Sequence, residues 1–219
     1  TYRDVNIAIA NEFSRLADRF GVDVWEAISI ANRHPRVRIL NPGPGVGGHC
    51  ISVDPWFFVE AAPDLTPLIH TARKVNDSQP EFVLELVRKT LGDLQGRKIA
   101  ALGLAYKPDV DDLRESPAVE VLHHLVHAGA IVSAYEPYRT DFPVEHVRMC
   151  TSLEDTLQGA DAVLLLVAHA QFKLLDAGKV AGLMPGRAAI DTVNCWERES
   201  WQANGFTLTR LGDRKQRPA

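Results

Sequence analysis

A cysteine and a carboxylate follow a glycine-rich segment and form the clearest candidate for chemistry. Residues 41–49 contain four glycines and two prolines, and they lead directly into Cys50, with Asp54 four residues later. Glycines let a backbone approach a ligand closely and turn its N–H groups toward it. A helix that begins between Ser52 and Pro55 would favour a thiolate at Cys50, which is the nucleophilic form of cysteine. The pattern predicts a nucleophile with a nearby carboxylate; from spacing alone, a plain loop over a buried, inert cysteine is an equal alternative.

A charged segment, residues 107–117, forms a second candidate. It follows a short apolar run at residues 98–104 and contains Lys107 and Arg114. In open α/β sheets, ligands bind beyond the carboxyl ends of strands and at helix N-termini. Lys107 and Arg114 are therefore candidates to hold a phosphate or a sugar, with a solvated charged loop as the alternative.

Two other patterns have weaker chemical support. Gly103-Leu104-Ala105 preserves only a fragment of the G-x-G-x-x-G fingerprint, so this half of the chain is not an obvious NAD domain. Three histidines have helical spacing, but no carboxylate or cysteine completes a metal site, so no metal is predicted. We interpret them as an exposed helix face: His123, His124 and His127.

The cysteines are sparse. The chain has three, Cys50, Cys150 and Cys195, without a C-x-x-C pair or the Cys/His spacing of metal ligands. Such a set predicts neither a disulfide framework nor a structural zinc site, and it is typical of a reducing cytoplasm. Cys150 and Cys195 lack a neighbouring glycine loop, so we expect both to be structural.

Composition excludes several classes of protein. The 219 residues are 46% hydrophobic and 24% charged, and 24 Lys and Arg against 28 Asp and Glu leave a net charge of −4. This mixture is typical of a globular protein and gives no broad positive field for nucleic acid or anionic lipid. No apolar run approaches the roughly 20 residues that span a bilayer. The first residue is not Met, so we expect the natural chain to begin upstream.

Residues 1–93 are expected to be mainly helical. Apolar residues recur at three- and four-residue steps until Gly21, at Val5, Ile9, Phe13, Leu16 and Phe20. Asp23 is suited to cap a second helix, and further helices are predicted over Thr66–Asn76 and Pro80–Leu91. The glycine-rich segment between them cannot be a helix or a central strand.

Residues 94–219 are expected to form a parallel α/β sheet. Apolar segments suited to buried strands alternate with helical patterns over residues 116–126 and 153–159. The strand candidates are residues 98–104, 131–135, 161–167, 188–190 and 206–208. The change of character predicts a domain boundary near residues 92–97.

Together, these segments resemble the UDP-glucose/GDP-mannose dehydrogenase family, whose members oxidise the C6 alcohol of a nucleotide sugar to a carboxylate. The matches are Asn11-Glu12, His34-Pro35-Arg36-Val37, Pro42 to Cys50 with Asp54, Ala72-Arg73 with Asn76-Asp77, and Lys107 through Pro117. Tyr2 to Asn6 and Val53 are similar to the branch that oxidises UDP-N-acetylmannosamine, since UDP-glucose dehydrogenases usually have Lys where Val53 stands. The alternatives are oxidation of UDP-N-acetylglucosamine or UDP-glucose, or an inactive UDP-sugar-binding dimerisation module.

The resemblance implies a three-part protein. This chain matches the all-α central dimerisation domain and the Rossmann-like UDP-binding α/β domain that follows it. An NAD-binding domain and a catalytic Lys and Asn are implied upstream of Thr1, so the chain alone is expected to be inactive. A homodimer through the helical domain is also implied. Family members often have an Arg where Val193 stands, so one sugar or phosphate contact is in question.

The resemblance also assigns roles to residues. Cys50 is implied to attack an aldehyde formed by a first hydride transfer to NAD; a second transfer gives a thioester, which water releases with help from Asp54. Arg36 is implied to reach the substrate of a neighbouring subunit, Lys107 to contact UDP, and Arg114 to lie near the cofactor or substrate cleft. The loop residues implied to hold the sugar are Gly43, Gly45, Gly47, Gly48 and His49.

Overall fold

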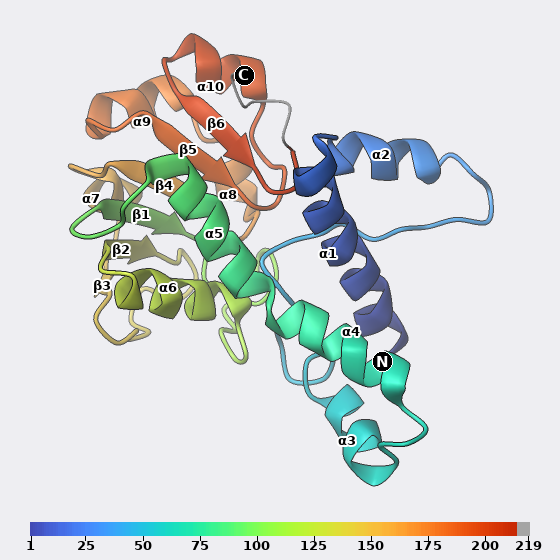
Figure 1. Ribbon diagram of the computed structural model, residues 1–219. Coiled ribbons are helices and arrows are strands. Elements are labelled where there is room, and N and C mark those ends of the chain that lie inside the picture. The colour runs from blue at the N-terminus through green and yellow to red at the C-terminus, as the bar shows by residue number, and fades with distance from the viewer. Residues whose placement is uncertain (214–219) are drawn as a thin grey trace.

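The computed structural model describes residues 1–213, which form a group of helices beside a layered α/β part (Figure 1). The helical part consists of α1 (Tyr2–Phe20), α2 (Val24–Ala31), α3 (Asp54–Ala61) and α4 (Pro67–Asp77). Gly21 ends α1 with a φ of 73°, as predicted. Asp23 caps α2 by accepting the N–H groups of Trp25 and Glu26.

Six parallel strands form one sheet in the order β3-β2-β1-β4-β5-β6. They are β1 (Lys98–Leu102), β2 (Ile131–Tyr135), β3 (Arg148–Met149), β4 (Ala162–Leu165), β5 (Ala188–Asp191) and β6 (Thr207–Arg210). With β1 and β4 side by side at the centre, this order is that of a doubly wound nucleotide-binding fold. The predicted parallel α/β sheet is confirmed.

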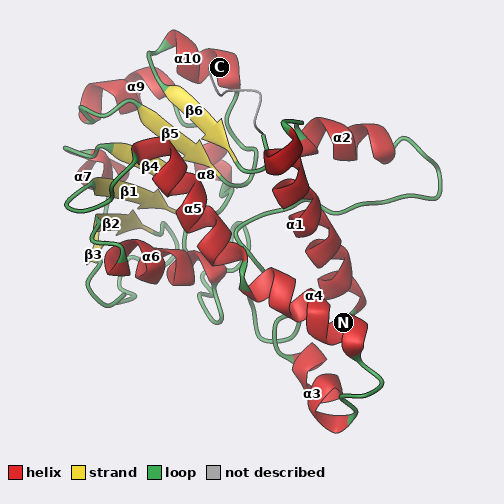
Figure 2. Ribbon diagram, in the orientation of Figure 1, coloured by secondary structure: helices red, strands yellow, loops and turns green. Residues whose placement is uncertain are grey.

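Alternate residues of the central strands face two separate hydrophobic cores. On one face, Ile99 and Leu164 are buried under α5 (Gln79–Leu91) and α6 (Pro117–His127). On the other face, Leu102 and Leu165 are covered by α7 (Leu153–Leu157), α8 (Ala170–Lys173), α9 (Ala177–Leu183) and α10 (Arg198–Ala203). Figure 2 shows the sheet between these two layers of helices.

The hydrophobic cores divide the chain earlier than the change from helix to strand does. α5 belongs to the helical half of the sequence, yet Val83, Leu86 and Val87 are buried in the same core as Ile99 of the sheet. α4 packs instead against α1 and α3. The cores therefore divide between α4 and α5, whereas the secondary structure changes at the predicted residues 92–97.

Four short elements have no counterpart among the predicted ones. β3 has two residues, α8 four, α9 seven and α10 six. Segments of this length contain too few residues for a periodic signal. Each strand and helix that the sequence predicts is present, with the small shifts at the ends that are usual for such boundaries.

α1 buries its polar side and exposes its apolar side, the reverse of an ordinary amphipathic helix. Its buried side is made of small and polar residues, among them Asp4, Asn11 and Ser14. The apolar stripe stays on the surface, where Leu16 is 47% and Phe20 71% exposed. Within residues 1–213, no helix is long and apolar enough to cross a bilayer.

Candidate active site

The glycine-rich loop, residues 41–53, is fastened to both parts of the chain. On the helical side, the Gly43 N–H donates to Asn11 Oδ1 (3.0 Å), and Asn11 Nδ2 donates to Asn76 Oδ1 (2.9 Å). On the α/β side, the Gly48 N–H donates to the carbonyl of Arg114 (3.1 Å). The loop therefore lies at the junction of the two parts.

Close packing against the α/β part explains why a glycine stands at position 47. A Cβ at this position would lie 2.8 Å from Pro117 Cδ, 2.9 Å from Tyr106 Cβ, and closer still to the carbonyl of Glu115. Only a residue without a side chain lets the two backbones approach in this way. Gly43 differs, because a Cβ there would meet nothing within 4 Å.

Gly45 and Gly48 are constrained by both contact and conformation. Their φ angles are 143° and 89°, which L-residues with a side chain rarely adopt. A Cβ on Gly45 would lie 2.8 Å from Pro117 Cβ, and one on Gly48 would lie 2.8 Å from the Tyr106 ring. These glycines join the two parts of the chain; their contact with a sugar stays a prediction.

Cys50 is exposed on this loop. The burial that the alternative supposed is therefore wrong, and the reactivity of Cys50 stays a prediction. The neighbouring His49 places Nδ1 3.4 Å from Nη2 of Arg114. Asp112 raises the pKa of Arg114 through its hydrogen bonds and its charge. The fold thus brings His49 and Cys50 beside an arginine of the α/β part.

Asp54 begins α3 on the same exposed turn. Its N–H donates to the carbonyl of Cys50 (2.8 Å), so one turn links the two residues ahead of the helix. The Asp54 side chain is exposed. The predicted helix start between Ser52 and Pro55 is confirmed, and it places both candidate catalytic residues at the N-terminal end of α3.

Asp112 orients Arg114, a role that sequence reasoning missed although the carboxylate stands two residues away. Arg114 Nε lies 2.9 Å from Asp112 Oδ1, and Nη2 lies 2.6 Å from Oδ2. This bidentate pair lowers the pKa of Asp112 to about 2. Lys107 lies earlier in the same loop, exposed, with Nζ 5.2 Å from the centre of the Tyr106 ring. Both candidate cations therefore follow β1.

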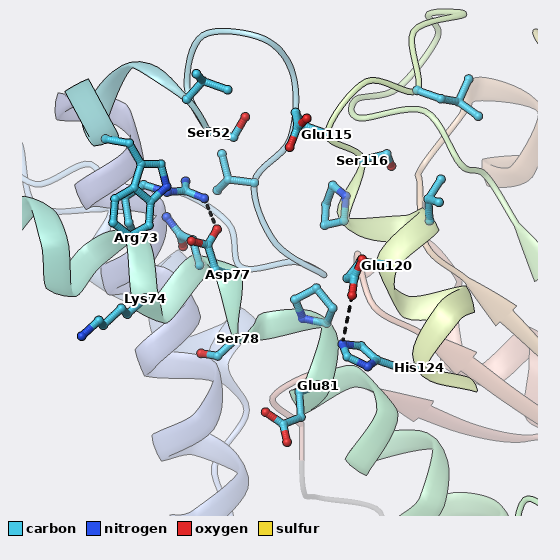
Figure 3. Close-up of a pocket in the computed structure, with 18 residues that line it drawn as sticks. Ser52, Arg73, Lys74, Asp77, Ser78, Glu81, Glu115, Ser116, Glu120 and His124 are labelled. Carbon is cyan, nitrogen blue, oxygen red and sulfur yellow. Dashed lines mark hydrogen bonds and ion pairs between the residues drawn. The ribbon is translucent and has the colours of Figure 1, made fainter. Parts of the chain in front are cut away.

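A cavity of about 890 Å³ lies at the junction of the helical and α/β parts (Figure 3). In this view Ser52 and Glu115 lie along one edge, and Ser78 and Glu81 lie along the opposite edge. Cys50 is absent from the residues that line it. Some residues of the glycine loop therefore line the cavity, whereas the exposed Cys50 lies outside it.

A buried arginine ties α1 to α4 beside this cavity. Arg73 Nη1 donates to Asp4 Oδ1 (2.6 Å), and its Nη2 pairs with Asp77 (Figure 3). Asn76 Nδ2 also donates to Asp4 Oδ1 (2.8 Å). Burial raises the pKa of Asp77, and the charge of Arg73 offsets only part of that rise. This network holds Asn76 in place, and with it the Asn11 side chain that binds Gly43.

The α/β part does not offer a dinucleotide site at its first turn. In dinucleotide-binding folds, the N–H groups after the first strand bind the pyrophosphate. Here Oε2 of Glu136 already accepts the N–H groups of Leu104 (2.7 Å) and Ala105 (3.0 Å). Glu136 is completely buried. These residues therefore do not fit NAD.

The other candidates lie outside this junction. Cys150 is buried, and burial raises the pKa of Cys195 to about 12. A carboxylate does stand beside the histidines of α6, since Glu120 lies 3.7 Å from His123 and 3.6 Å from His124. Within residues 1–213, no group of three His, Cys, Asp or Glu side chains is placed to hold a metal ion.

Arg36 lies in a segment that leaves the rest of the molecule. α2 and the chain after it project away from the sheet (Figure 1). Arg36 is exposed, and its N–H donates to Nδ1 of His34 in the same segment (3.3 Å). Its role at the substrate of a neighbouring subunit stays a prediction.

Two family models match this chain. Residues 1–78 match the central domain of the UDP-glucose/GDP-mannose dehydrogenase family, and residues 100–198 match its UDP-binding domain. The chain belongs to this family. The glycine loop and Cys50 lie in the family's central domain, and Lys107 and Arg114 lie in its UDP-binding domain.

Known relatives are similar over almost the whole chain. A UDP-N-acetyl-D-mannosamine dehydrogenase of Methanocaldococcus jannaschii is 46% identical over 98% of this chain and 50% of the relative. An NDP-N-acetyl-D-galactosaminuronic acid dehydrogenase of Ralstonia nicotianae is 48% identical over 89% of this chain and 46% of the relative. The solved structure of a UDP-D-ManNAc dehydrogenase from Pyrococcus horikoshii aligns with a TM-score of 0.85 at 37% identity, over 98% of this chain and 50% of that one. The chain thus spans about half the length of these relatives.

Proposed function

We propose that this chain is the central and UDP-binding portion of an NAD-dependent dehydrogenase that oxidises UDP-N-acetylmannosamine to the uronate. The observation that supports the proposal most directly is the exposed Cys50, on a glycine loop that docks against Arg114 of the UDP-binding domain. A sugar whose nucleotide is held by the loop after β1 lies within reach of that surface. The names of the relatives support an N-acetylhexosamine substrate.

The chemistry of Cys50 follows from its position. A thiolate adds to the C6 aldehyde and forms a C–S bond; loss of the C6 hydride from this adduct gives a thioester, and water then releases the carboxylate and the thiol. Asp54, on the same turn, orients or deprotonates that water. NAD, when bound to the parent protein, supplies the hydride acceptor for both oxidations. Because the first turn of the described α/β part does not fit NAD, we assign its binding to another part of the parent protein, with Arg114 at the edge of the cofactor cleft.

Binding of UDP tests the nucleotide-binding half of the proposal. We expect calorimetry to detect UDP binding by this chain and a Lys107→Ala variant to bind about tenfold more weakly, which corresponds to one lost charge-assisted contact. Lys98→Ala is the matched control, because Lys98 is also exposed but begins β1, at the opposite end of the strand from Lys107. Equal affinities of the two variants would remove Lys107 from the site.

The sugar is tested with the parent protein. We expect carboxylate formation to be fastest with UDP-N-acetylmannosamine, followed by UDP-N-acetylglucosamine and UDP-glucose. Val53, which lines the cavity, stands where the resemblance places a lysine in UDP-glucose dehydrogenases. A parent protein that binds UDP but oxidises none of these sugars would instead be a binding module.

The exposed stripe of α1 supports a homodimer through the helical domain. A double variant, Leu16→Glu with Phe20→Glu, places charge on surface positions and spares the core. We expect it to raise the dimer dissociation constant at least tenfold in sedimentation experiments, because burial of apolar area drives such association. Leu174→Glu is the control, since Leu174 is 86% exposed on the α/β part. A wild-type chain that is monomeric at high micromolar concentration would exclude the dimer.

A further inference from the structure

The carboxyl ends of three central strands meet at a buried, hydrogen-bonded pair of side chains that the proposed chemistry does not use. Glu136 directly follows β2, and His169 lies just beyond β4; both side chains are completely buried. His169 Nε2 lies 3.0 Å from Oε2 of Glu136, the same oxygen that accepts the N–H groups after β1. The pair therefore joins the ends of β1, β2 and β4 at the point where ligands bind in doubly wound folds.

The carboxylate takes the place of a bound anion. In a dinucleotide-binding unit, a short turn after the first strand directs its N–H groups at a phosphate. Here the Leu104 and Ala105 N–H groups point at Glu136 instead. Burial favours the protonated form of Glu136, yet the hydrogen bonds from His169 and Leu104 outweigh it and hold its pKa below the usual value. An ionised carboxylate of the chain itself thus occupies the phosphate position.

The same pair anchors the loop that carries Lys107 and Arg114. The Asp109 N–H donates to Nδ1 of His169 (2.8 Å). Since Nδ1 accepts this bond, Nε2 carries the proton that is donated to Glu136. Asp109 has a φ of 61°, a strained value for a residue with a side chain. A strained residue is held there because its surroundings determine its position.

Further contacts pin Asp109 from both sides. Its Oδ1 accepts the Ala170 N–H (2.9 Å) and the hydroxyl of Tyr138 (3.1 Å). Ala170 and Tyr138 lie beyond the ends of β4 and β2, as His169 and Glu136 do. Lys107 stands only two residues before Asp109, so any movement of Asp109 displaces it.

We propose that Glu136 fills the phosphate position of this α/β domain with the chain's own carboxylate, and that His169 uses it to position the Lys107–Arg114 loop for a nucleoside diphosphate. The turn after β1 then has no free N–H groups at Leu104 and Ala105 for the pyrophosphate of a dinucleotide. The nucleotide is bound instead by the Lys107–Arg114 loop. Glu136 and His169 are positioning residues. The proposal rests on the proposed function only for the identity of the nucleoside diphosphate, which is UDP.

A matched pair of substitutions at His169 tests the anchor. His169→Asn keeps an acceptor near the Nδ1 position and so keeps the Asp109 bond, whereas His169→Gln keeps only a donor near the Nε2 position. We expect hydrogen exchange of residues 105–116 to accelerate at least tenfold in the Gln variant and clearly less in the Asn variant, which keeps the Asp109 bond and loses only the bond to Glu136. A merely structural histidine predicts equal effects, or a larger effect of the smaller Asn. That result, or unchanged exchange in both variants, would overturn the anchor.

Two further readouts complete the test. UDP affinity should fall about tenfold in His169→Gln and little in His169→Asn, as expected for one lost hydrogen bond. Equal affinities despite altered exchange would overturn the link to binding.

In Glu136→Ala, added formate should restore slow exchange of the loop and formamide should not, because the vacated position takes an anion. No rescue by formate would overturn the assignment of Glu136, and if this variant does not fold, the His169 pair decides. Failure of the wild-type chain to bind UDP would count against the proposed function, whereas loop exchange tests the anchor independently.

Discussion

The Cys50→Ser variant of the parent protein is expected to lose carboxylate formation by about 10³-fold or more, as is common when a covalent nucleophile is removed. A serine hydroxyl is hardly ionised near neutral pH, whereas a thiol ionises far more readily, and the thiolate is the nucleophilic form. The oxidation of the alcohol needs no thiol, so aldehyde should accumulate in place of the uronate. Product analysis by mass spectrometry distinguishes the two compounds.

The other cysteines are the controls for this experiment. Cys150→Ser and Cys195→Ser should change turnover little, because Cys150 is buried and burial raises the pKa of Cys195 to about 12. Iodoacetamide should alkylate Cys50 first, and a UDP-sugar should protect it. If Cys50→Ser releases uronate at a near-normal rate, the thioester route is wrong for this protein.

Gly47→Ala is expected to separate the glycine loop from the α/β domain. The added Cβ collides with Pro117, Tyr106 and the Glu115 carbonyl, and backbone atoms cannot rotate away as a side chain can. Overpacking of this kind costs about 1–3 kcal/mol in the free energy of unfolding. A shift of the loop by about 1 Å also displaces Cys50, which can lower the rate of carboxylate formation about 10²-fold.

Gly43→Ala is the matched control in the same loop. Neither Gly43 nor Gly47 has a positive φ, so the backbone tolerates alanine at both positions, and only the space around them differs. We expect Gly43→Ala to resemble the wild type in denaturant unfolding. Equal behaviour of the two variants would show that docking of the loop against the α/β domain is not required.

Local signals in the sequence predicted most of the elements. Gly21 ends α1 and Asp23 caps α2, because cap residues act on the backbone within one turn. The apolar runs at β1 and β4 predicted buried strands, since a strand covered on both faces has no polar side. The patterns did not predict the short α8, α9 and α10, whose place is set by packing on the sheet.

The sequence named the candidate residues, whose roles stay predictions, and the structure supplied their geometry. The glycines around Cys50 indicated a close backbone approach, but the partner in that approach is Tyr106 to Pro117 of the next domain. The exposure of Cys50 could not be decided from spacing, and the buried alternative proved wrong once the loop was seen to dock with the cysteine outward. Asp112 was present in the charged segment, yet only its geometry distinguishes a bidentate partner of Arg114 from a solvated carboxylate.

By itself, the sequence determined what depends on neighbours along the chain: the caps, the strand and helix patterns, the loop without secondary structure, and the apolar stripe of α1. The tertiary structure alone decided what depends on residues far apart. It placed α5 in the core of the sheet, joined the glycine loop to the segment after β1, and brought Glu136 and His169 to the ends of three strands. The physical reason is that periodicity and capping act over a few residues, whereas burial, steric fit and the pairing of buried charges depend on which distant segments the fold brings into contact.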